Sequence, residues 1–401
     1  MDDDPPVTRA AESSVVRIAL VAETYLPAVN GVTYTLEKVR SHLLAQGHRV
    51  LIIAPSSGSA VPSSGGVVKS TEADGATLIQ LPAMPIAGYS DIRVAVGGVP
   101  KLKRLLADFA PDVVHLASPF ELGRRAAKAA EQLGIPTLAI YQTDVPGYLA
   151  RYGVAFLENF AWQRVAHIHQ VVTRTLAPSN SAVAQLSAHG IPRVELWGRG
   201  VDTDRFHPRH RSERFRRSVA PRGELLIGYV GRLAAEKQVE DLARVQDIPG
   251  AKLVIVGDGP QRAMLEARLP RAHFTGFLSG AALGSAMASL DLFVHPGELE
   301  TFCQTIQEAM ASGVPVVATG RGGPLDLVDP SRTGWLYPPG DLEQLRAYAR
   351  DLLGDDAKRS AFAAAAFTSV QKRTWPVLCE RLEQHYREVI VEHQLLHLGR
   401  R

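Results

Sequence analysis

The chain has 401 residues, more than one ordinary hydrophobic core organises, so two domains are expected. Its 44 basic and 41 acidic residues leave a formal net charge of +3, a near balance that gives no case for nucleic-acid binding. Cys303 and Cys379 are far apart and indicate neither a disulfide framework nor a cysteine zinc site. Residues 1–13 begin acidic, unlike a signal peptide, and are expected to form a disordered tail. With no apolar run of membrane-spanning length, a cytoplasmic address is expected.

Short apolar runs alternate with helical segments, the pattern of parallel sheets covered by helices. In the first half, the expected strands are Val15–Ala22, Arg49–Ala54, Asp112–Leu116, Thr137–Tyr141 and Val194–Trp197. The expected helices between them are Val32–Gln46, Lys101–Phe109 and Glu121–Leu133. Gly47 and Gly134 follow two of these helices, as C-terminal caps commonly do.

The second half restarts the cycle with expected strands at Leu225–Val230, Lys252–Val256, His273–Thr275, Leu292–His295 and Pro315–Ala318. A polar, arginine-rich stretch, Asp204–Gly223, separates the halves and is expected to be the linker. The last stretch has apolar residues at helical spacing. We therefore expect a first domain at 14–204, a second at 205–376, and a C-terminal helix at about 377–397 that packs back on the first.

Two carboxylates follow the expected strand Leu292–His295. Glu300 falls in the loop, and Glu308 falls about two helical turns later on the same face. In open α/β sheets, ligands sit outside the carboxyl ends of the strands, so both acids could face one bound molecule. Backbone N–H groups at the helix start could also receive a phosphate. By itself, a loop acid followed by a solvated helix acid is the commoner explanation of this pattern.

Two cations flank a turn early in the second half. Gly231-Arg232-Leu233 follows an expected strand, and Lys237 comes shortly afterwards. The pair suits a diphosphate, because Arg engages two oxygens and Lys supplies a point charge. Taken alone, such a pair is more commonly an ordinary part of a charged surface loop.

The segment Pro27–Val32 leads from the first expected strand into the first expected helix. Gly31, preceded by Asn30, lets the backbone approach a phosphate closely, and the helix N-terminus adds a positive end. The segment is not Gly-x-Gly-x-x-Gly, and the turn Gly257-Asp258-Gly259-Pro260 also lacks the third glycine. A dinucleotide-binding dehydrogenase is therefore not indicated.

These blocks, in this order, resemble the retaining family-4 glycosyltransferases over roughly residues 15–395. The resemblance implies an α/β structure with the GT-B fold, in which two Rossmann-like domains with parallel sheets face each other across a cleft. It implies that Glu300 holds the hydroxyls of the donor sugar. It also implies that Arg232 and Lys237 hold the donor diphosphate and stabilise its charge as it leaves.

The resemblance extends to the rest of the donor site. Glu308 would contact the nucleotide ribose, and the other implied donor contacts are Asn30, Gly31, Arg199, Leu278, Thr301, Phe302 and Cys303. Arg199 ends the first domain near the cleft and could instead contact the acceptor, while Asp202 is expected to fix the hinge. Cys303 departs from the family pattern, in which Gly is usual, and its side chain narrows the donor pocket slightly.

The block Tyr141-Gln142-Thr143-Asp144-Val145 follows a strand of the first domain. It resembles a subgroup of actinobacterial α-mannosyltransferases that act on glycolipids. Many relatives carry a His near Gln142 that touches the donor sugar, and this His is absent here. Asp144 is the candidate catalytic group on the acceptor side. As a lone acid after a strand, it could equally cap the next helix.

The resemblance implies transfer with retention, in which the leaving diphosphate helps to deprotonate the incoming hydroxyl. No cofactor is expected, and the donor is a nucleotide diphosphate sugar, with GDP-mannose favoured by the subgroup. UDP-glucose, UDP-N-acetylglucosamine and UDP-sulfoquinovose remain alternatives, as do a nucleotide-sugar epimerase and a non-enzymatic sugar-nucleotide binding subunit. The expected acceptor is a glycolipid or another small hydroxylated molecule.

No metal site is expected, because the chain has no His-Glu-x-x-His, no cysteine pair and no convincing Asp-x-Asp. His115 lies in an apolar strand and is expected to be a core histidine. Two expected helices carry basic residues beside leucines, namely Lys101, Lys103, Arg104, Arg124 and Arg125. They predict peripheral contact with an anionic membrane. Ordinary solvated helix faces explain them equally well.

Overall fold

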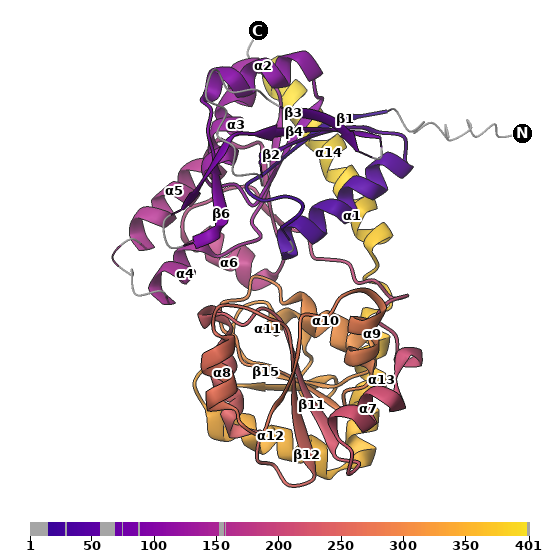
Figure 1. Ribbon diagram of the computed structural model, residues 1–401. Helices are drawn as coiled ribbons and strands as arrows, with labels where there is room; N and C mark the ends of the chain where they lie inside the picture. The colour runs from indigo at the N-terminus through magenta and orange to yellow at the C-terminus, as the bar shows by residue number, and fades with distance from the viewer. Residues whose placement is uncertain are drawn as a thin grey trace, which may run out of the picture.

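The computed structural model describes residues 15–28, 30–56, 69–73, 75–86, 89–151, 156 and 158–398. The tail expected at 1–13 and Val29 of the segment Pro27–Val32 lie outside the described residues. The chain forms two α/β domains, one above the other in Figure 1, each with a sheet between helices. The two-domain α/β architecture predicted from the sequence is confirmed.

The first domain is built on a sheet with the strand order β10-β9-β8-β7-β1-β2-β4-β3. Neighbouring strands are parallel except β3 and β4. The central strands are buried along nearly their whole length, which explains their continuous apolar runs. Their bounds are β1 Arg17–Ala22, β2 Arg49–Pro55, β3 Lys69–Ala73, β4 Ala76–Leu81, β7 Val113–Ala117, β8 Thr137–Ile140, β9 Arg174–Ala177 and β10 Val194–Leu196.

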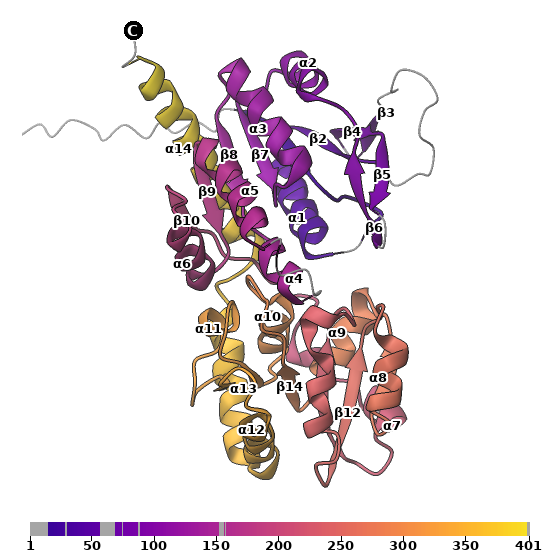
Figure 2. The same cartoon turned by 90° about the vertical axis from the view of Figure 1, so that its left-hand side faces the viewer.

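Helices cover both faces of this sheet (Figures 1 and 2). The first helix begins at Gly31 because the Asn30 side chain accepts hydrogen bonds from the backbone N–H groups of Val32 and Thr33. The remaining elements of this domain are α1 Gly31–Ala45, the hairpin β5 Ala83–Ile86 and β6 Tyr89–Ala95, α2 Val99–Phe109, α3 Glu121–Leu133, α4 Val145–Arg151, α5 Glu158–Val171 and α6 Asn180–Ala188.

The second domain has a parallel sheet with the order β13-β12-β11-β14-β15-β16. This is the order of a Rossmann sheet, and its direction of winding reverses between β11 and β14. The strands are β11 Leu225–Val230, β12 Ala251–Val256, β13 His273–Gly276, β14 Leu292–His295, β15 Val316–Thr319 and β16 Gly334–Tyr337. The helices are η2 Pro208–His210, α7 Glu213–Val219, η3 Ala235–Lys237, η4 Val239–Arg244, α8 Arg262–Arg268, α9 Gly280–Ala288, α10 Gln304–Ala311, α11 Pro324–Leu327, α12 Leu342–Gly354 and α13 Asp356–Val370.

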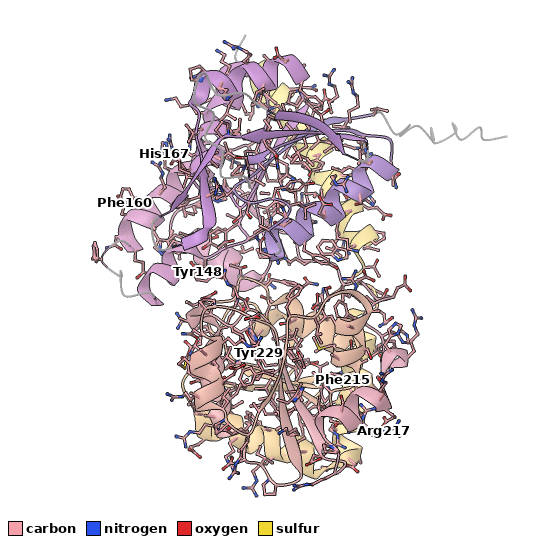
Figure 3. All side chains as sticks on the ribbon, viewed as in Figure 1. Tyr148, Phe160, His167, Phe215, Arg217 and Tyr229 are labelled. Carbon is pink, nitrogen blue, oxygen red and sulfur yellow. The ribbon has the colours of Figure 1, made fainter. Side chains whose placement is uncertain are left out.

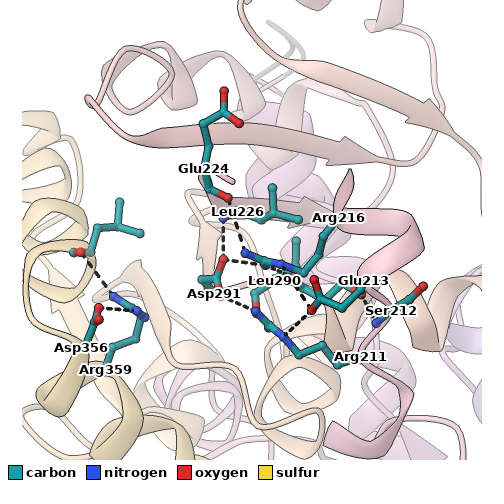
Figure 4. A network of polar contacts seen from close by, with 12 residues as sticks. Arg211, Ser212, Glu213, Arg216, Glu224, Leu226, Leu290, Asp291, Asp356 and Arg359 are labelled. Atoms are coloured by element: carbon teal, nitrogen blue, oxygen red, sulfur yellow. Dashed lines mark hydrogen bonds and ion pairs between the residues drawn. The ribbon is translucent and has the colours of Figure 1, made fainter. Parts of the chain in front are cut away.

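The stretch expected as a linker is structured and belongs to the second domain. It forms η2 and α7, and α7 is held by an ionic network around Asp291 (Figure 4). The Asp291 carboxylate accepts from Arg211 Nη2 at 2.9 Å, Arg216 Nη1 at 2.7 Å and the Leu226 backbone N–H at 2.7 Å. The arginines of this segment favoured a solvated linker in the sequence analysis. Two of them, Arg211 and Arg216, instead bind the segment to the sheet.

The final helix, α14 Trp375–Leu398, returns to the first domain. It runs beside that domain in both Figure 1 and Figure 2, where it is yellow. Its apolar face joins the core beneath β1 and β8, and Trp197 Nε1 donates to the Leu378 carbonyl at 2.8 Å. The last helix of the chain thus contributes to the core of the first domain.

Candidate active site

Glu300 lies at the centre of a charged cluster at the carboxyl end of β14. Its Oε1 is 2.6 Å from Lys237 Nζ and 3.0 Å from His295 Nε2. Burial alone would raise the pKa of Glu300, but the Lys237 charge and the hydrogen bonds from His295 and Lys237 hold it at about 2. The Glu300 carboxylate is therefore ionised at neutral pH.

Lys237 reaches this carboxylate from η3, which follows β11. Burial would lower the pKa of Lys237, but the opposing Glu300 charge raises it well above its ordinary value, so the ammonium stays charged. Because β11 and β14 flank the point where the sheet order reverses, their two following loops meet where α/β sheets bind ligands. The sequence pattern placed Glu300 and Lys237 near one ligand, and the fold brings them into contact.

Arg232 lies in the turn between β11 and η3, and its side chain is exposed. Tyr229 OH donates to the Arg232 carbonyl at 3.1 Å, which fixes the turn. The neighbouring glycine turn makes this geometry possible, because a Cβ at Gly257 would lie 1.9 Å from the Gly231 carbonyl oxygen. The glycines that superficially suggested a dinucleotide fingerprint thus serve close backbone packing beneath the two cations.

Arg199 brings a cation to the cleft from the first domain. It is buried, its Nη2 donates to Gln142 Oε1 at 3.1 Å, and a Cβ at Gly31 would lie 3.0 Å from its Nη1. Burial lowers the pKa of Arg199 to about 10, while the Glu300 charge acts in the opposite direction. Arg199, Gly31 and Glu300, which are far apart in the sequence, therefore lie close together in the fold.

The loop that carries Glu300 also touches the first domain directly. Thr301 Oγ1 donates to the Gln142 carbonyl oxygen at 2.8 Å across the cleft. Phe302 and Cys303 are buried in the second-domain core, and Leu278 packs against the same core. Cys303 precedes α10 with φ at 72°, a left-handed conformation that costs a residue with a Cβ about 1 kcal/mol or more. A glycine at this position would adopt the same conformation without that cost.

Glu308 has the opposite environment to Glu300. It is buried on α10, and burial raises its pKa to about 8 against the opposing effects of Arg205 and a hydrogen bond from Gln304. It lies near the hinge, where Asp202 Oδ2 is 3.2 Å from Lys38 Nζ and Asp202 Oδ1 accepts from the Arg205 backbone N–H. The ribose contact implied for Glu308 remains a prediction.

Asp144 is engaged within the first domain. Its carboxylate accepts hydrogen bonds from the Gly147 backbone N–H and Tyr141 OH, each at 3.0 Å, and from Gln185 Nε2 at 3.3 Å. The bond to Gly147 caps α4, which is the structural alternative that the sequence left open. The catalytic assignment of Asp144 to the acceptor side remains a prediction.

The part of the chain that the structure describes also contains residues that could attract a metal ion. Ligand atoms of His295, Glu300 and Cys303 lie within 4.8 Å of one another. Lys237 already occupies the Glu300 carboxylate, and its positive charge would repel a cation placed there. The donor set therefore fits a metal ion poorly.

Sequence reasoning missed three residues of this site. His295 was expected only as the last residue of a strand. Gln142 was noted only because many relatives carry a His near this position. Tyr148 was not assigned a role. Tyr148, on α4, interacts electrostatically with Lys237 and Glu300 of the other domain. No sequence signal could have linked it to them, because the contact depends on how the domains meet.

Comparison with known proteins supports this architecture. A family model described as Glycosyltransferase Family 4 matches residues 29–205, and one described as Glycosyl transferases group 1 matches residues 210–368. Sucrose-phosphate synthase from Thermosynechococcus elongatus has a similar solved structure, with a TM-score of 0.77 at 20% identity, covering 94% of this chain and 99% of that chain. At that identity, the likeness shows the fold alone.

Curated relatives match over nearly the whole length. The GDP-mannose-dependent alpha-mannosyltransferase of Mycolicibacterium smegmatis is 47% identical, covering 94% of this chain and 98% of its own. The GDP-mannose-dependent alpha-(1-6)-phosphatidylinositol dimannoside mannosyltransferase of Mycobacterium tuberculosis is 29% identical, covering 76% of this chain and 79% of its own. The present chain therefore belongs to the family-4 glycosyltransferases and is a glycosyltransferase with the GT-B fold.

Proposed function

We propose that this glycosyltransferase moves mannose from GDP-mannose to a hydroxyl acceptor and retains the anomeric configuration. Both relatives described above are named as GDP-mannose-dependent mannosyltransferases, and these names support GDP-mannose as the donor and mannose as the sugar. GDP-mannose carries an α-linked sugar, so an α-linked product means retention. The observation that carries the proposal is Glu300 held between Lys237 and His295, because it sets an ionised carboxylate beside a buried cation at the reversal point of the second sheet.

The charges of this cluster suit the loss of a nucleoside diphosphate. As the bond from the sugar to the diphosphate breaks, negative charge grows on the phosphate oxygens, and Lys237 and Arg232 stabilise it. Glu300 is ionised, so it accepts hydrogen bonds from sugar hydroxyls and has no proton to deliver. In the proposed mechanism, the leaving diphosphate takes the proton of the attacking hydroxyl on the same face of the sugar.

No metal or other cofactor enters this proposal. Arg199, Arg232 and Lys237 supply three cationic side chains around the cleft, and they replace the charge that a divalent ion would otherwise bring to a diphosphate. We accordingly expect transfer to proceed at the same rate in the presence of excess chelator.

The choice of donor is tested by comparing GDP with UDP. A ligand that binds only the folded state raises the melting temperature. At a ligand concentration of a hundred times its Kd, the folded state is stabilised by about 2.7 kcal/mol. We expect GDP and GDP-mannose to stabilise the protein at concentrations where UDP and UDP-glucose do not. Equal or greater stabilisation by UDP would exclude the mannose assignment and favour a UDP-sugar.

For the acceptor, we propose a glycolipid and a peripheral contact with the membrane that contains it. The name of the mycobacterial relative gives a phosphatidylinositol dimannoside, which supports a lipid-linked acceptor. Among the described helices, none is both long enough and apolar enough to cross a bilayer. Exposed Arg104 and half-buried Lys103 on α2 are cations that a lipid headgroup could reach.

A further inference from the structure

A tyrosine of the first domain projects to the boundary between the domains. Tyr148 lies on α4, and α4 contacts η3, the turn that carries Lys237. Figure 3 shows the labelled Tyr148 at the lower edge of the first domain, facing the second. Its side chain is half-buried, so part of it is exposed.

Three hydrogen bonds hold the start of α4, which carries Tyr148, near the loop that carries Glu300. Thr301, the neighbour of Glu300, donates to the Gln142 carbonyl and so joins the β14 loop to the loop that precedes α4. Asp144 then caps α4 through the Gly147 backbone N–H, and the Tyr148 backbone N–H bonds to the Asp144 carbonyl at 3.1 Å. The first turn of α4 is thus tied to the catalytic loop of the other domain.

The phenol of Tyr148 lies in the field of several charged side chains. Lys237 and Glu300 of the second domain are among these charges, and Arg199, Glu236 and Asp144 also act on the phenol. Burial raises the pKa of Tyr148 first, and Glu300 raises it further, against the effect of Lys237. The hydroxyl therefore keeps its proton at neutral pH, so it is suited to donate a hydrogen bond and not to act as a base.

We propose that Tyr148 contacts the transferred hexosyl group from the side opposite Glu300, donating a hydrogen bond to one of its hydroxyls. This inference rests on the proposed function, because it places the sugar of the donor beside Glu300. The sugar subsite is then built by both domains, with Tyr148 from the first and Glu300 from the second.

The test is Tyr148→Phe, which removes the hydroxyl and keeps the ring. Calorimetry with GDP and with GDP-mannose separates the nucleotide from the sugar. We expect unchanged affinity for GDP and about tenfold weaker affinity for GDP-mannose, the scale of one lost hydrogen bond. Tyr348→Phe is the matched control, since Tyr348 is half-buried and stacks on Trp335 in the second domain, away from the cleft.

Three results would overturn the inference. Unchanged affinity for both ligands with a raised KM for the acceptor would assign Tyr148 to acceptor binding. A fall in both affinities with a lower melting temperature would make its role structural. Unchanged affinities and unchanged kinetics would remove it from the site altogether. If the wild-type protein preferred UDP, the proposed donor alone would fail, and the same comparison would be made with UDP and its sugar nucleotide.

Discussion

Glu300 and Glu308 share one loop and helix, yet the fold gives them opposite protonation at neutral pH. The Glu300 carboxylate is ionised beside Lys237, with a pKa of about 2, and the Glu308 carboxyl is largely protonated, with a pKa of about 8. Two carboxyls whose pKa values are driven apart in one cleft are typical of divided roles. Here the ionised group faces the expected position of the sugar, and the protonated group lies near the hinge.

Replacing Glu300 by Gln should lower turnover by about 10²–10³, the effect of losing one preorganised contact in the transition state. The amide keeps the shape but loses the charge that pairs with Lys237. Single-turnover measurement of sugar transfer is the direct readout. Glu298→Gln is the matched control, because Glu298 lies in the same loop but pairs with Arg321 and Gln238 and not with Lys237. Parental turnover in Glu300→Gln would remove Glu300 from catalysis.

The raised pKa of Glu308 predicts a pH-dependent stability. Because its folded-state pKa of about 8 exceeds the ordinary value of 4.5, its contribution is fully present below pH 4.5 and is lost as the pH rises through 8. Glu308→Gln removes this titration. The melting temperature of the variant should therefore rise relative to that of the wild type between pH 5 and pH 8. The same change should weaken GDP binding more than it lowers turnover.

The Glu300 variant gives a control of opposite sign. The lowered pKa of Glu300 makes its contribution present above pH 4.5 and lost as the pH falls towards 2. Glu300→Gln should therefore lose stability relative to the wild type at neutral pH and recover part of that difference in acid. If the Glu308 variant showed the same pH trend as the Glu300 variant, the assigned environment of Glu308 would be wrong.

Among the elements, the long buried strands were predictable, whereas two short strands, β9 and β16, were missed. Strands such as β1 and β7 are buried along their length and read as apolar runs. The edge strand β16 is only half-buried at its centre, and β9 is short and begins with Arg174, so neither gives a continuous apolar signal. The hairpin and strands between β2 and α2 were also missed, because their polar and apolar residues are mixed.

The C-terminal helix α14 is attached to the first domain by polar as well as apolar contacts. Glu383 Oε1 is 2.7 Å from His42 Nε2, and its Oε2 is 3.2 Å from His48 Nε2. Tyr386 OH is 2.6 Å from Nδ1 of His115, the histidine that the sequence placed in the core. Burial lowers the pKa of His115 to about 3, so this imidazole is neutral.

Replacing Tyr386 by Phe should destabilise the protein by about 1–3 kcal/mol, because a buried imidazole nitrogen loses its partner. Denaturant unfolding followed by circular dichroism measures the difference. Arg381→Ala, at an exposed position of the same helix, should change stability by less than about 0.5 kcal/mol. Equal effects of the two substitutions would show that the His115–Tyr386 bond does not hold α14 in place.

At the scale of the whole molecule, the sequence predicted the fold and the proximity of Glu300 and Lys237. Glu300, Lys237 and Arg232 follow strands of one sheet, and the meeting of strand ends in a parallel sheet is a rule that a sequence reader can apply. The contacts of Gln142, Arg199 and Tyr148 with that cluster cross the cleft. They depend on the angle between two domains, which no spacing along the chain encodes.

Fewer of the basic residues expected to contact a membrane are available for that contact in the structure. Arg124 and Arg125 on α3 pair with Glu121, and Arg125 also donates to backbone carbonyls. Their charges are therefore partly compensated within the domain. Lys103 and Arg104 on α2 remain as cations without a described ion-pair partner in the part of the chain that the structure covers.

We accordingly predict weak, salt-sensitive binding to anionic vesicles through α2. Each cation near such a surface contributes about 1 kcal/mol, so the double variant Lys103→Glu/Arg104→Glu should bind at least about thirtyfold more weakly. Sedimentation with anionic and neutral vesicles at low and high salt measures this. Arg214→Glu/Arg217→Glu, on the exposed face of α7 in the second domain, is the matched control and should bind like the wild type. An equal loss in the control would show only a general charge effect, and a wild-type protein that stayed in solution with anionic vesicles at low salt would favour a soluble acceptor.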